Sequence, residues 1–364
     1  MGEGLTVVYD PHHPQRPHHP YPSHAPSLEG APAVTRLQRM RSRGIPILAF
    51  IILSMGSLLA LRRADATLGP PEAEAPPPPP PSARLAASAL GRSKGVHMRF
   101  ALPGERVQFP LELRSAPSSV TFEWIPLGEL APLDSARVVA GTLNAPRRPG
   151  FYRLAVVNAG GRTIIDSLTL AVMVPFEEKR GSTINGYQIG YYKGERWSDA
   201  LERPRGFLEI SEPHADLQLS AHMRVGDFIT HDQQTRWPRY AAVDGRLLDK
   251  LELIFDEIAS WHGGEGRAPV EVDVHSGFRT PLYNQRVPRA AGDSRHQYGD
   301  AADIAVDANR DGRIDRKDVR LIELAVEIVE KKYPDLVGGL GVYTQGGASY
   351  AHVDARGRKA RWRG

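Results

Sequence analysis

Residues 294–304 read Ser-Arg-His-Gln-Tyr-Gly-Asp-Ala-Ala-Asp-Ile and contain two side chains of the kinds that bind metals, His296 and Asp303. These two residues are seven positions apart, a spacing that does not place them neatly on one face of a helix. Gly299 lies between them and instead predicts a turn that folds the aspartate back beside the histidine. The segment therefore predicts half of a metal site built around a turn.

A second pair of candidate residues, His352 and Asp354, lies in the strand predicted last in the chain. Residues two apart on a strand point to the same face, so both side chains can face one cavity. The chain contains no cysteine, and any metal must therefore be held by His, Asp or Glu. A set of two imidazoles and one carboxylate, from His296, Asp303 and His352, would leave a fourth zinc position for water, as a catalytic site requires.

The residues around these motifs alternate between helical and strand patterns. Apolar residues at helical spacing predict amphipathic helices over about 245–260 and 319–332, and alternation predicts a strand over 270–274. A hairpin over 342–354, turning around Gly346-Gly347, is expected to close the domain. This mixture predicts an α+β domain over residues 179–364.

The preceding segment, residues 95–178, has short runs rich in β-forming residues, separated by turn signals such as Pro149-Gly150. Such spacing predicts a small all-β sandwich of the immunoglobulin-like kind. The segment has no cluster of catalytic residue types, so we interpret it as a spacer or wall-binding module. The runs lie at Val107–Phe109, Val120–Trp124, Phe151–Val157 and Leu168–Val172.

The N-terminal part of the chain predicts a membrane anchor. Residues 1–43, rich in proline and histidine, are expected to be a disordered cytoplasmic tail, and residues 44–61 an uncharged transmembrane helix. Four arginines shortly before this run and two just after it predict that the rest of the chain is exported into the periplasm of a bacterium. Residues 62–94 form a proline-rich linker. The alternative is a cleaved signal peptide, with Ala64-Asp65-Ala66 as its cleavage site.

The bulk composition limits the partners. The chain has 364 residues, 41% of them hydrophobic, a formal net charge of +4 and a pI near 9.2. A basic balance is compatible with nucleic acid, acidic lipid or an anionic polymer. No run of interleaved arginines and aromatic residues marks the folded part, so we do not expect nucleic-acid binding.

A second metal signature, residues 307–318, comes directly after the first motif. It has the spacing of an EF-hand calcium loop, with Gly312 at the sharp turn and the backbone carbonyl of Arg313 at the seventh position. No entering helix precedes it, so it resembles the half-hands of dockerins, and the alternative is an acidic surface loop. The predicted calcium ligands are Asp307, Asn309, Asp311, Arg313, Asp315 and Asp318.

Three segments together resemble the VanY-like zinc D-alanyl-D-alanine peptidases of bacterial cell walls, most of all the branch with a terminal His-Val-Asp that includes murein endopeptidases. These segments are residues 276–280, 294–304 and 338–362, and the resemblance extends over about 182–362. The motif Ser-x-His-x-x-Gly-x-Ala-x-Asp is matched at every position. The resemblance implies a hedgehog/DD-peptidase fold, and it implies zinc ligands at the three residues named above.

The resemblance also implies catalytic roles. The family's motif arginine corresponds to Arg279, which would hold substrate or the developing oxyanion, or else is a structural arginine in a turn. Better-known members have an acidic base three residues before the last histidine, where this chain has Ser349. Asp354 is our candidate for the base. Alternatively, it is a carboxylate that orients the imidazole of His352.

Three functions are therefore considered as hypotheses. The first is a membrane-anchored zinc peptidase that cuts peptidoglycan stem peptides or cross-links. The second is a non-catalytic metal-binding protein of the cell wall, which Ser349 favours. The third is a hedgehog-like signalling or adhesion module carried by the β-rich segment. The sequence does not distinguish carboxypeptidase from endopeptidase.

Overall fold

The computed structural model describes ten segments of the chain, and all of them belong to one compact unit, residues 75–364. The predicted tail and the predicted transmembrane segment lie outside the described residues, as does most of the predicted linker. The described segments are residues 83–85, 91–108, 111–113, 121–127, 134–136, 142–158, 161–197, 202–263, 270–345 and 349–364.

The C-terminal half is built on a five-stranded sheet. All neighbouring strands are antiparallel except β17 and β19, which are parallel. The predicted strand and closing hairpin are confirmed as β15 and as β17 with β18. In order across the sheet the strands are β15 (Val272–Ser276), β16 (Ala301–Val306), β18 (Tyr350–Asp354), β17 (Gly339–Tyr343) and β19 (Ala360–Arg363).

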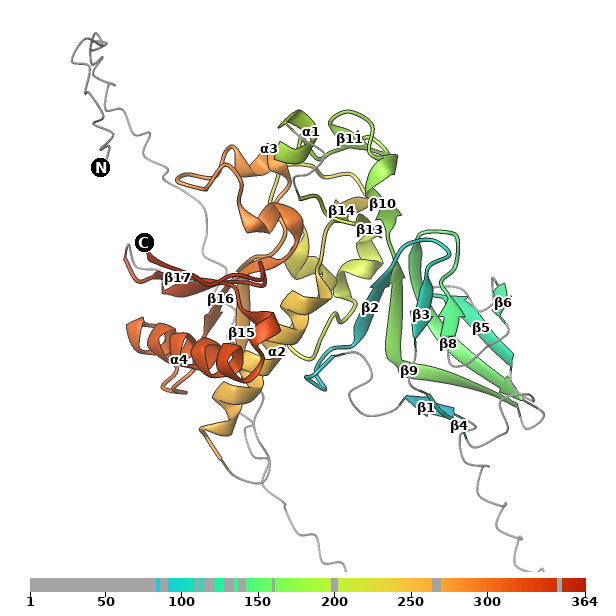
Figure 1. The fold of residues 1–364 in the computed structure, drawn as a ribbon, viewed down its shortest axis with the longest axis horizontal. Coiled ribbons are helices and arrows are strands. Elements are labelled where there is room, and N and C mark those ends of the chain that lie inside the picture. The colour runs from blue at the N-terminus through green and yellow to red at the C-terminus, as the bar shows by residue number, and fades with distance from the viewer. Residues whose placement is uncertain are drawn as a thin grey trace, which may run out of the picture. The chain divides into compact units, whose positions relative to one another are not determined.

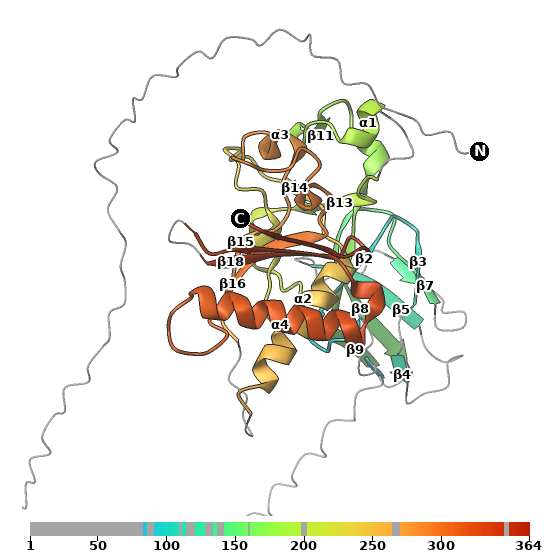
Figure 2. The same ribbon diagram turned by 60° about the vertical axis from the view of Figure 1, so that its left-hand side comes forward.

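Two long helices, α2 (Gly245–Ser260) and α4 (Arg316–Lys332), pack against one face of this sheet (Figures 1 and 2). Both confirm predicted helices, and α4 begins three residues earlier than expected. Each helix is preceded by an N-cap aspartate, Asp244 or Asp315, whose carboxylate accepts a backbone N–H of the first turn. Such caps satisfy donors that would otherwise lack a partner.

The N-terminal half contains a second five-stranded sheet and two small ribbons. The sheet has the order β2 (Met98–Ala101), β9 (Gly161–Val172), β8 (Gly150–Asn158), β5 (Thr121–Pro126) and β6 (Asp134–Ala136). The ribbons pair β1 (Ala83–Leu85) with β4 (Leu111–Leu113), and β3 (Arg106–Gln108) with β7 (Thr142–Asn144).

Short elements connect the two halves. A three-stranded sheet has the order β10 (Val174–Pro175), β13 (Gly206–Ile210) and β14 (Arg239–Ala241), and a ribbon pairs β11 (Thr183–Ile184) with β12 (Tyr187–Gln188). The short helices are α1 (Lys193–Trp197), α3 (Pro281–Asn284) and the 3-10 turns η2 (Phe176–Glu178), η3 (Glu212–Asp216), η4 (Val225–Phe228), η5 (Arg295–Tyr298) and η6 (Pro334–Leu336).

The second sheet contributes to two hydrophobic cores. On β8, Tyr152 and Leu154 pack in a core with the small ribbons, whereas Phe151 belongs to the core that also contains α2 and α4. Met98 of β2 and Ala171 of β9 join this larger core in the same way. Neighbouring positions on a strand point to opposite faces of the sheet. Residues on one face therefore pack in one core, and residues on the other face pack in the other core.

The fold class expected from the sequence, an α+β hedgehog/DD-peptidase-like domain behind a separate immunoglobulin-like sandwich, is wrong. The described residues form a mixed α/β structure with six sheets and few helices. The N-terminal sheet, with the order β2-β9-β8-β5-β6, shares the main core instead of closing into a sandwich of its own. Its residues Met98, Phe151 and Ala171 pack in the same core as the C-terminal half.

No transmembrane helix is found in the described segments, since none of their helices combines the length and the apolar character that a bilayer crossing demands. Residues 44–61, where such a helix was predicted, are not among the described segments.

Candidate metal centre

The candidate metal ligands project from one face of the C-terminal sheet. Asp303 on β16 lies directly opposite His352 on β18, and Gly341 on β17 lies on the other side of His352. Their strand neighbours Ile304 and Val353 point the other way, into the core with the helices. The pleat of the sheet therefore separates a packed face from a face that carries the two ligands.

His296 comes from η5 and is held by the segment 276–280. Its Nδ1 lies 2.6 Å from the carbonyl oxygen of Gly277, so this nitrogen donates a proton and leaves Nε2 as the lone-pair donor. The backbone N–H of Arg279 in turn donates to the carbonyl of His296 at 3.1 Å. A side chain at position 277 would lie 2.8 Å from the carbonyl oxygen of Asp227, which explains the glycine.

The turn predicted at Gly299 is confirmed. Gly299 ends η5 in the left-handed region with φ 74°, and an added Cβ would lie 2.3 Å from the carbonyl oxygen of Ala242. Only glycine fits both demands. The reversal brings the two motif side chains together, with His296 Nε2 at 3.2 Å from Asp303 Oδ1.

The two oxygens of Asp303 have separate partners. Oδ1 faces both imidazoles, at 3.0 Å from His352 Nδ1, whereas Oδ2 accepts a hydrogen bond from Arg279 Nη2. The Nε of Arg279 donates to Ser276 Oγ at 2.7 Å. Arg279 is therefore placed beside the ligand carboxylate, which it holds so that one oxygen faces the ligand group.

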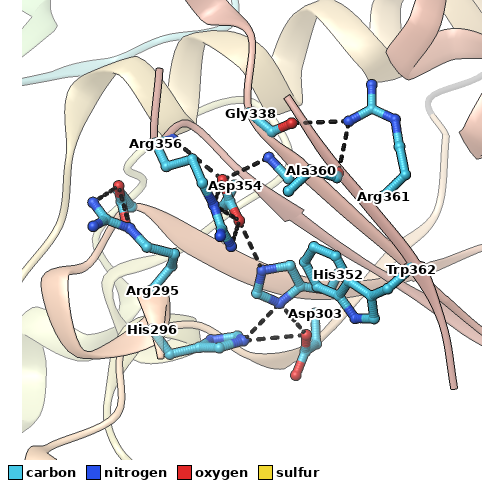
Figure 3. Close-up of polar contacts among 12 residues, drawn as sticks. Arg295, His296, Asp303, Gly338, His352, Asp354, Arg356, Ala360, Arg361 and Trp362 are labelled. Atoms are coloured by element: carbon cyan, nitrogen blue, oxygen red, sulfur yellow. Dashed lines mark hydrogen bonds and ion pairs between the residues drawn. The ribbon is translucent and has the colours of Figure 1, made fainter. Parts of the chain in front are cut away.

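His352 uses its two nitrogens in the opposite sense to His296. Its Nδ1 lies 3.0 Å from His296 Nε2, and its Nε2 lies 3.1 Å from Asp354 Oδ2 (Figure 3). Asp354 is fully buried and also accepts hydrogen bonds from Gly339 N at 2.7 Å and Arg356 Nε at 2.9 Å. This geometry favours Asp354 as the carboxylate that orients the imidazole, because it lies behind the ring and not beside the ligand atoms.

An aromatic group begins beside His352. The indole of Trp362 lies 5.1 Å from the imidazole, ring centre to ring centre (Figure 3). The indole N–H donates to the hydroxyl of Tyr343 at 2.9 Å. Tyr343 stacks on Tyr350 at 4.6 Å. Gly341 makes room for the indole, since a Cβ there would lie 2.4 Å from it.

The protonation of the group suits metal binding. Burial lowers the pKa of His296, which keeps this imidazole neutral. Burial alone would raise the pKa of Asp303, but the charges and hydrogen bonds of His296 and His352 hold it well below its usual range. Burial likewise opposes the proton on His352, but hydrogen bonds to Asp303 and Asp354 raise its pKa. A metal ion would replace the proton that these two carboxylates attract to His352.

The three side chains can hold a metal ion. One ligand atom from each of His296, Asp303 and His352 lies within 4.8 Å of the others, and all three residues are buried. Within the described segments, no other group of histidine and acidic side chains converges in this way. A donor set of two imidazoles and one carboxylate fits zinc and several other first-row metal ions.

The predicted calcium loop, residues 307–318, folds as a compact turn between β16 and α4. Asp307 accepts hydrogen bonds from the backbone of Asp311 and Gly312, at 3.2 and 2.8 Å. Buried Asp318 accepts from Asn309 N at 3.1 Å and from the N–H of Asp315, the N-cap residue of α4, at 2.7 Å. The acidic side chains thus point back onto the loop backbone. Asp315 caps α4, and Arg313 donates its N–H to Asp311 at 3.0 Å.

Some residues of the centre were not predicted from the sequence. Arg356 and Trp362 reach it from the last turn and from β19, and Gly339 and Gly341 make space beside it. The two glycines are two residues apart on β17 and therefore lie on the same face of the sheet. This pattern could have indicated that other side chains pack closely against that face. Ser349 lies just before β18 and is uncharged. It occupies the position where the peptidases that the motifs resemble have an acidic base.

No protein-family model matches the chain, and no curated protein is significantly similar to it. The case for a function therefore depends on the motifs and on the geometry of the metal group.

Proposed function

We propose that the protein is a zinc peptidase that hydrolyses amide bonds in peptidoglycan stem peptides or cross-links. The observation that carries the proposal is the buried group of His296, Asp303 and His352, whose ligand atoms converge within 4.8 Å. Further support comes from the motif resemblance, which includes Gly299 and Arg279 as well as the ligands. An active site outside the cytoplasm, facing the cell wall, remains part of this prediction.

The metal is the first part of the proposal to test. Two imidazoles and one carboxylate are typical of catalytic zinc, but the same set also occurs in iron(II) enzymes. We expect the purified protein to bind one zinc ion more tightly than iron(II), as measured by competition with a chelator. Preferential binding of iron(II) would reject the zinc assignment. Unchanged zinc binding in His296→Ala would also reject it.

The residues around the group would have distinct tasks in amide hydrolysis. A bound zinc ion would polarise the scissile carbonyl and activate water. Arg279 holds Asp303 with one N–H, and by the motif resemblance it would also contact a substrate carboxylate or oxyanion. Asp354 would keep His352 in the tautomer whose Nδ1 lone pair faces the ligand group.

Hydrolysis is tested on purified sacculi. We expect new muropeptides with the zinc-loaded protein and none with His296→Ala. His222→Asn is the matched control, because His222 lies away from the ligand group and pairs with Glu252. The new muropeptides themselves identify the bond that is cut, which separates carboxypeptidase from endopeptidase.

A second candidate function is a wall-binding protein that keeps the metal without hydrolysis. The observation that favours it is the absence of a free carboxylate at the centre: among the described residues, Asp303 and Asp354 are both engaged, and Ser349 replaces the usual base. Zinc binding with sedimentation on sacculi, but without new muropeptides, would establish this function in place of the first.

We also propose that loop 307–318 binds calcium. Its support is the register of oxygen side chains and the positive φ of Gly312, 79°, at the position where an EF-hand loop turns sharply. The loop joins β16, which carries Asp303, to α4. Calcium there would therefore stiffen one side of the metal centre.

A further inference from the structure

A buried ionic network lies directly behind Asp354. Lys250 of α2 has no exposed surface, and its Nζ donates to Glu330 Oε1 of α4 at 2.8 Å. The same Nζ donates to the backbone carbonyl of Asp354 at 2.7 Å. Two helices and the end of β18 therefore meet at one ammonium group.

Glu330 extends the network to the neighbouring strands. Its Oε1 also accepts from the backbone N–H of Gly338 at 3.0 Å, at the start of β17. Its Oε2 accepts from Arg361 Nη2 of β19 at 2.5 Å, and Arg361 also donates to the carbonyl of Gly338 (Figure 3). The carboxylate thus ties α4 to both strands that flank the aromatic side of the centre.

Such a network is costly for a protein to bury. A charge removed from water loses several kcal/mol of solvation, and apolar side chains of similar volume often serve stability equally well. A contribution to stability therefore does not by itself explain why charged residues are buried at positions 250 and 330. Their polar contacts converge on the backbone that presents Asp354, which in turn holds His352.

We propose that Lys250 and Glu330 are positioning residues for the metal centre, acting through Asp354. Lys250 fixes the carbonyl of Asp354, and Glu330 fixes Lys250 and the strand beside it. Asp354 then accepts the Nε2 proton of His352 at 3.1 Å, which leaves Nδ1 directed at Asp303 and His296. The inference rests on the proposed function only through the metal and not through hydrolysis.

The test compares two buried lysines in the full chain. Lys250→Met removes the donor to Asp354 but leaves Glu330 paired with Arg361. The control is Lys179→Met: Lys179 also donates to a glutamate, Glu195 at 2.6 Å, and to a backbone carbonyl, but it contacts no residue of the metal centre.

Zinc affinity, measured by chelator competition, is the readout that a merely structural role would not move. Losing a direct partner of a metal ligand usually weakens metal binding about 10–100-fold. Lys250 acts one contact further out, through Asp354, so we expect Lys250→Met to weaken zinc binding by about 10-fold, at the lower end of that range. Both lysine variants should lower the midpoint of thermal unfolding, and Lys179→Met should keep the zinc affinity of the wild type. Glu330→Gln, which still accepts from Lys250, should fall between Lys250→Met and the wild type.

Equal zinc affinity in Lys250→Met and wild type would overturn the proposal, and so would an equal loss in both lysine variants. If Lys250→Met does not fold, Glu330→Gln decides: unchanged zinc affinity in that variant overturns the proposal. The outcome is independent of the peptidase assignment. Zinc affinities of Lys250→Met and wild type can be compared even if the protein binds zinc without cutting sacculi.

Discussion

The two histidines of the metal centre present different ring nitrogens, and single neighbours decide which. The carbonyl of Gly277 accepts from Nδ1 of His296, whereas Asp354 accepts from Nε2 of His352. Each neighbour engages one ring nitrogen and thereby leaves the other facing the ligand group, where a metal ion would bind. The metal site thus depends on contacts one step beyond the ligands.

Gly299, the one glycine of the motif at residues 294–304, is expected to be sensitive to substitution. In Gly299→Ala, the left-handed backbone costs about 1–2 kcal/mol, and the new Cβ would also overlap the carbonyl of Ala242. Gly104→Ala is the control, because its φ of 73° is nearly the same and its Cβ would meet no atom within 4 Å. Urea unfolding should show a loss at least about twice as large for Gly299→Ala as for Gly104→Ala. Equal losses would show that the overlap relaxes without cost.

His222 should make the stability of the fold depend on pH. Its Nδ1 lies 2.8 Å from buried Glu252, and this hydrogen bond raises the pKa of His222 against the opposing effect of burial. The folded state therefore holds the proton more tightly than the unfolded chain. The stabilisation is complete below the ordinary histidine pKa of about 6.5 and is lost as the pH rises through the folded value.

The variant that tests this pH dependence is His222→Asn, which keeps a donor near Glu252 but does not titrate. At about pH 5.5 it should be less stable than the wild type by roughly 1–2 kcal/mol, and by less at about pH 8.5. Thermal unfolding at the two pH values measures the difference. A gap that stays constant or widens towards high pH would contradict the assigned pair.

At the scale of elements, the loop between β16 and α4 connects the two predicted metal sites. Asp315 and Asp318 form the capping box of α4, so the last residues of the loop are also the first support of the helix. The same helix carries Glu330, which contacts β17 and β19. An ion in the loop would therefore stabilise an element that borders the metal centre.

We expect calcium to raise the stability of the protein. At calcium concentrations about 100-fold above the dissociation constant, the gain is about 2.7 kcal/mol if only the folded state binds. Asp307→Ala should abolish this gain, since Asp307 is the first predicted ligand of the loop. Thermal unfolding with and without calcium measures it, and Asp166→Ala, a change at an exposed carboxylate on β9, is the control. A protein indifferent to calcium would have an acidic surface loop at this position.

If calcium stiffens the metal centre, removing calcium should weaken zinc binding in the wild type and have no effect in Asp307→Ala. Zinc titration in the presence and absence of a calcium-selective chelator tests the coupling. Unchanged zinc affinity would separate the two sites.

For the whole molecule, the shared core makes the two halves depend on each other. Val96, Met98 and Phe151 from the first half pack in the same core as α2 and α4, and Val96 also forms a β-bridge to Ser220. The domain boundary expected after residue 178 remains a prediction. The core implies that cutting there exposes apolar surface on both pieces.

A truncated chain of residues 179–364 should therefore unfold more readily than the full protein. Losing three buried apolar side chains alone removes about 1.5–3 kcal/mol for each. Dye binding to exposed apolar surface should increase, and the midpoint of urea unfolding should fall. An equally stable truncated chain, with unchanged zinc affinity, would instead support two independent domains.

Local sequence patterns predicted the parts of the ligand group separately. The turn at Gly299 paired His296 with Asp303, and the two-residue period of a strand paired His352 with Asp354. It was the motif resemblance that joined the two parts into one predicted site. The helices α2 and α4 were predicted from their apolar period. These features depend on residues close together in the chain, which is why the sequence by itself determined them.

Only the tertiary structure decided what lies behind and around the ligands. The placement of Asp354 behind His352, the parallel addition of β19 with Trp362, and the burial of Lys250 all join residues that are distant in the chain or that a local pattern leaves ambiguous. The same holds for the fold class, because the apolar face of a strand does not reveal which partner covers it. Long-range packing chose a common core over a closed sandwich, and with it the environment of the metal centre.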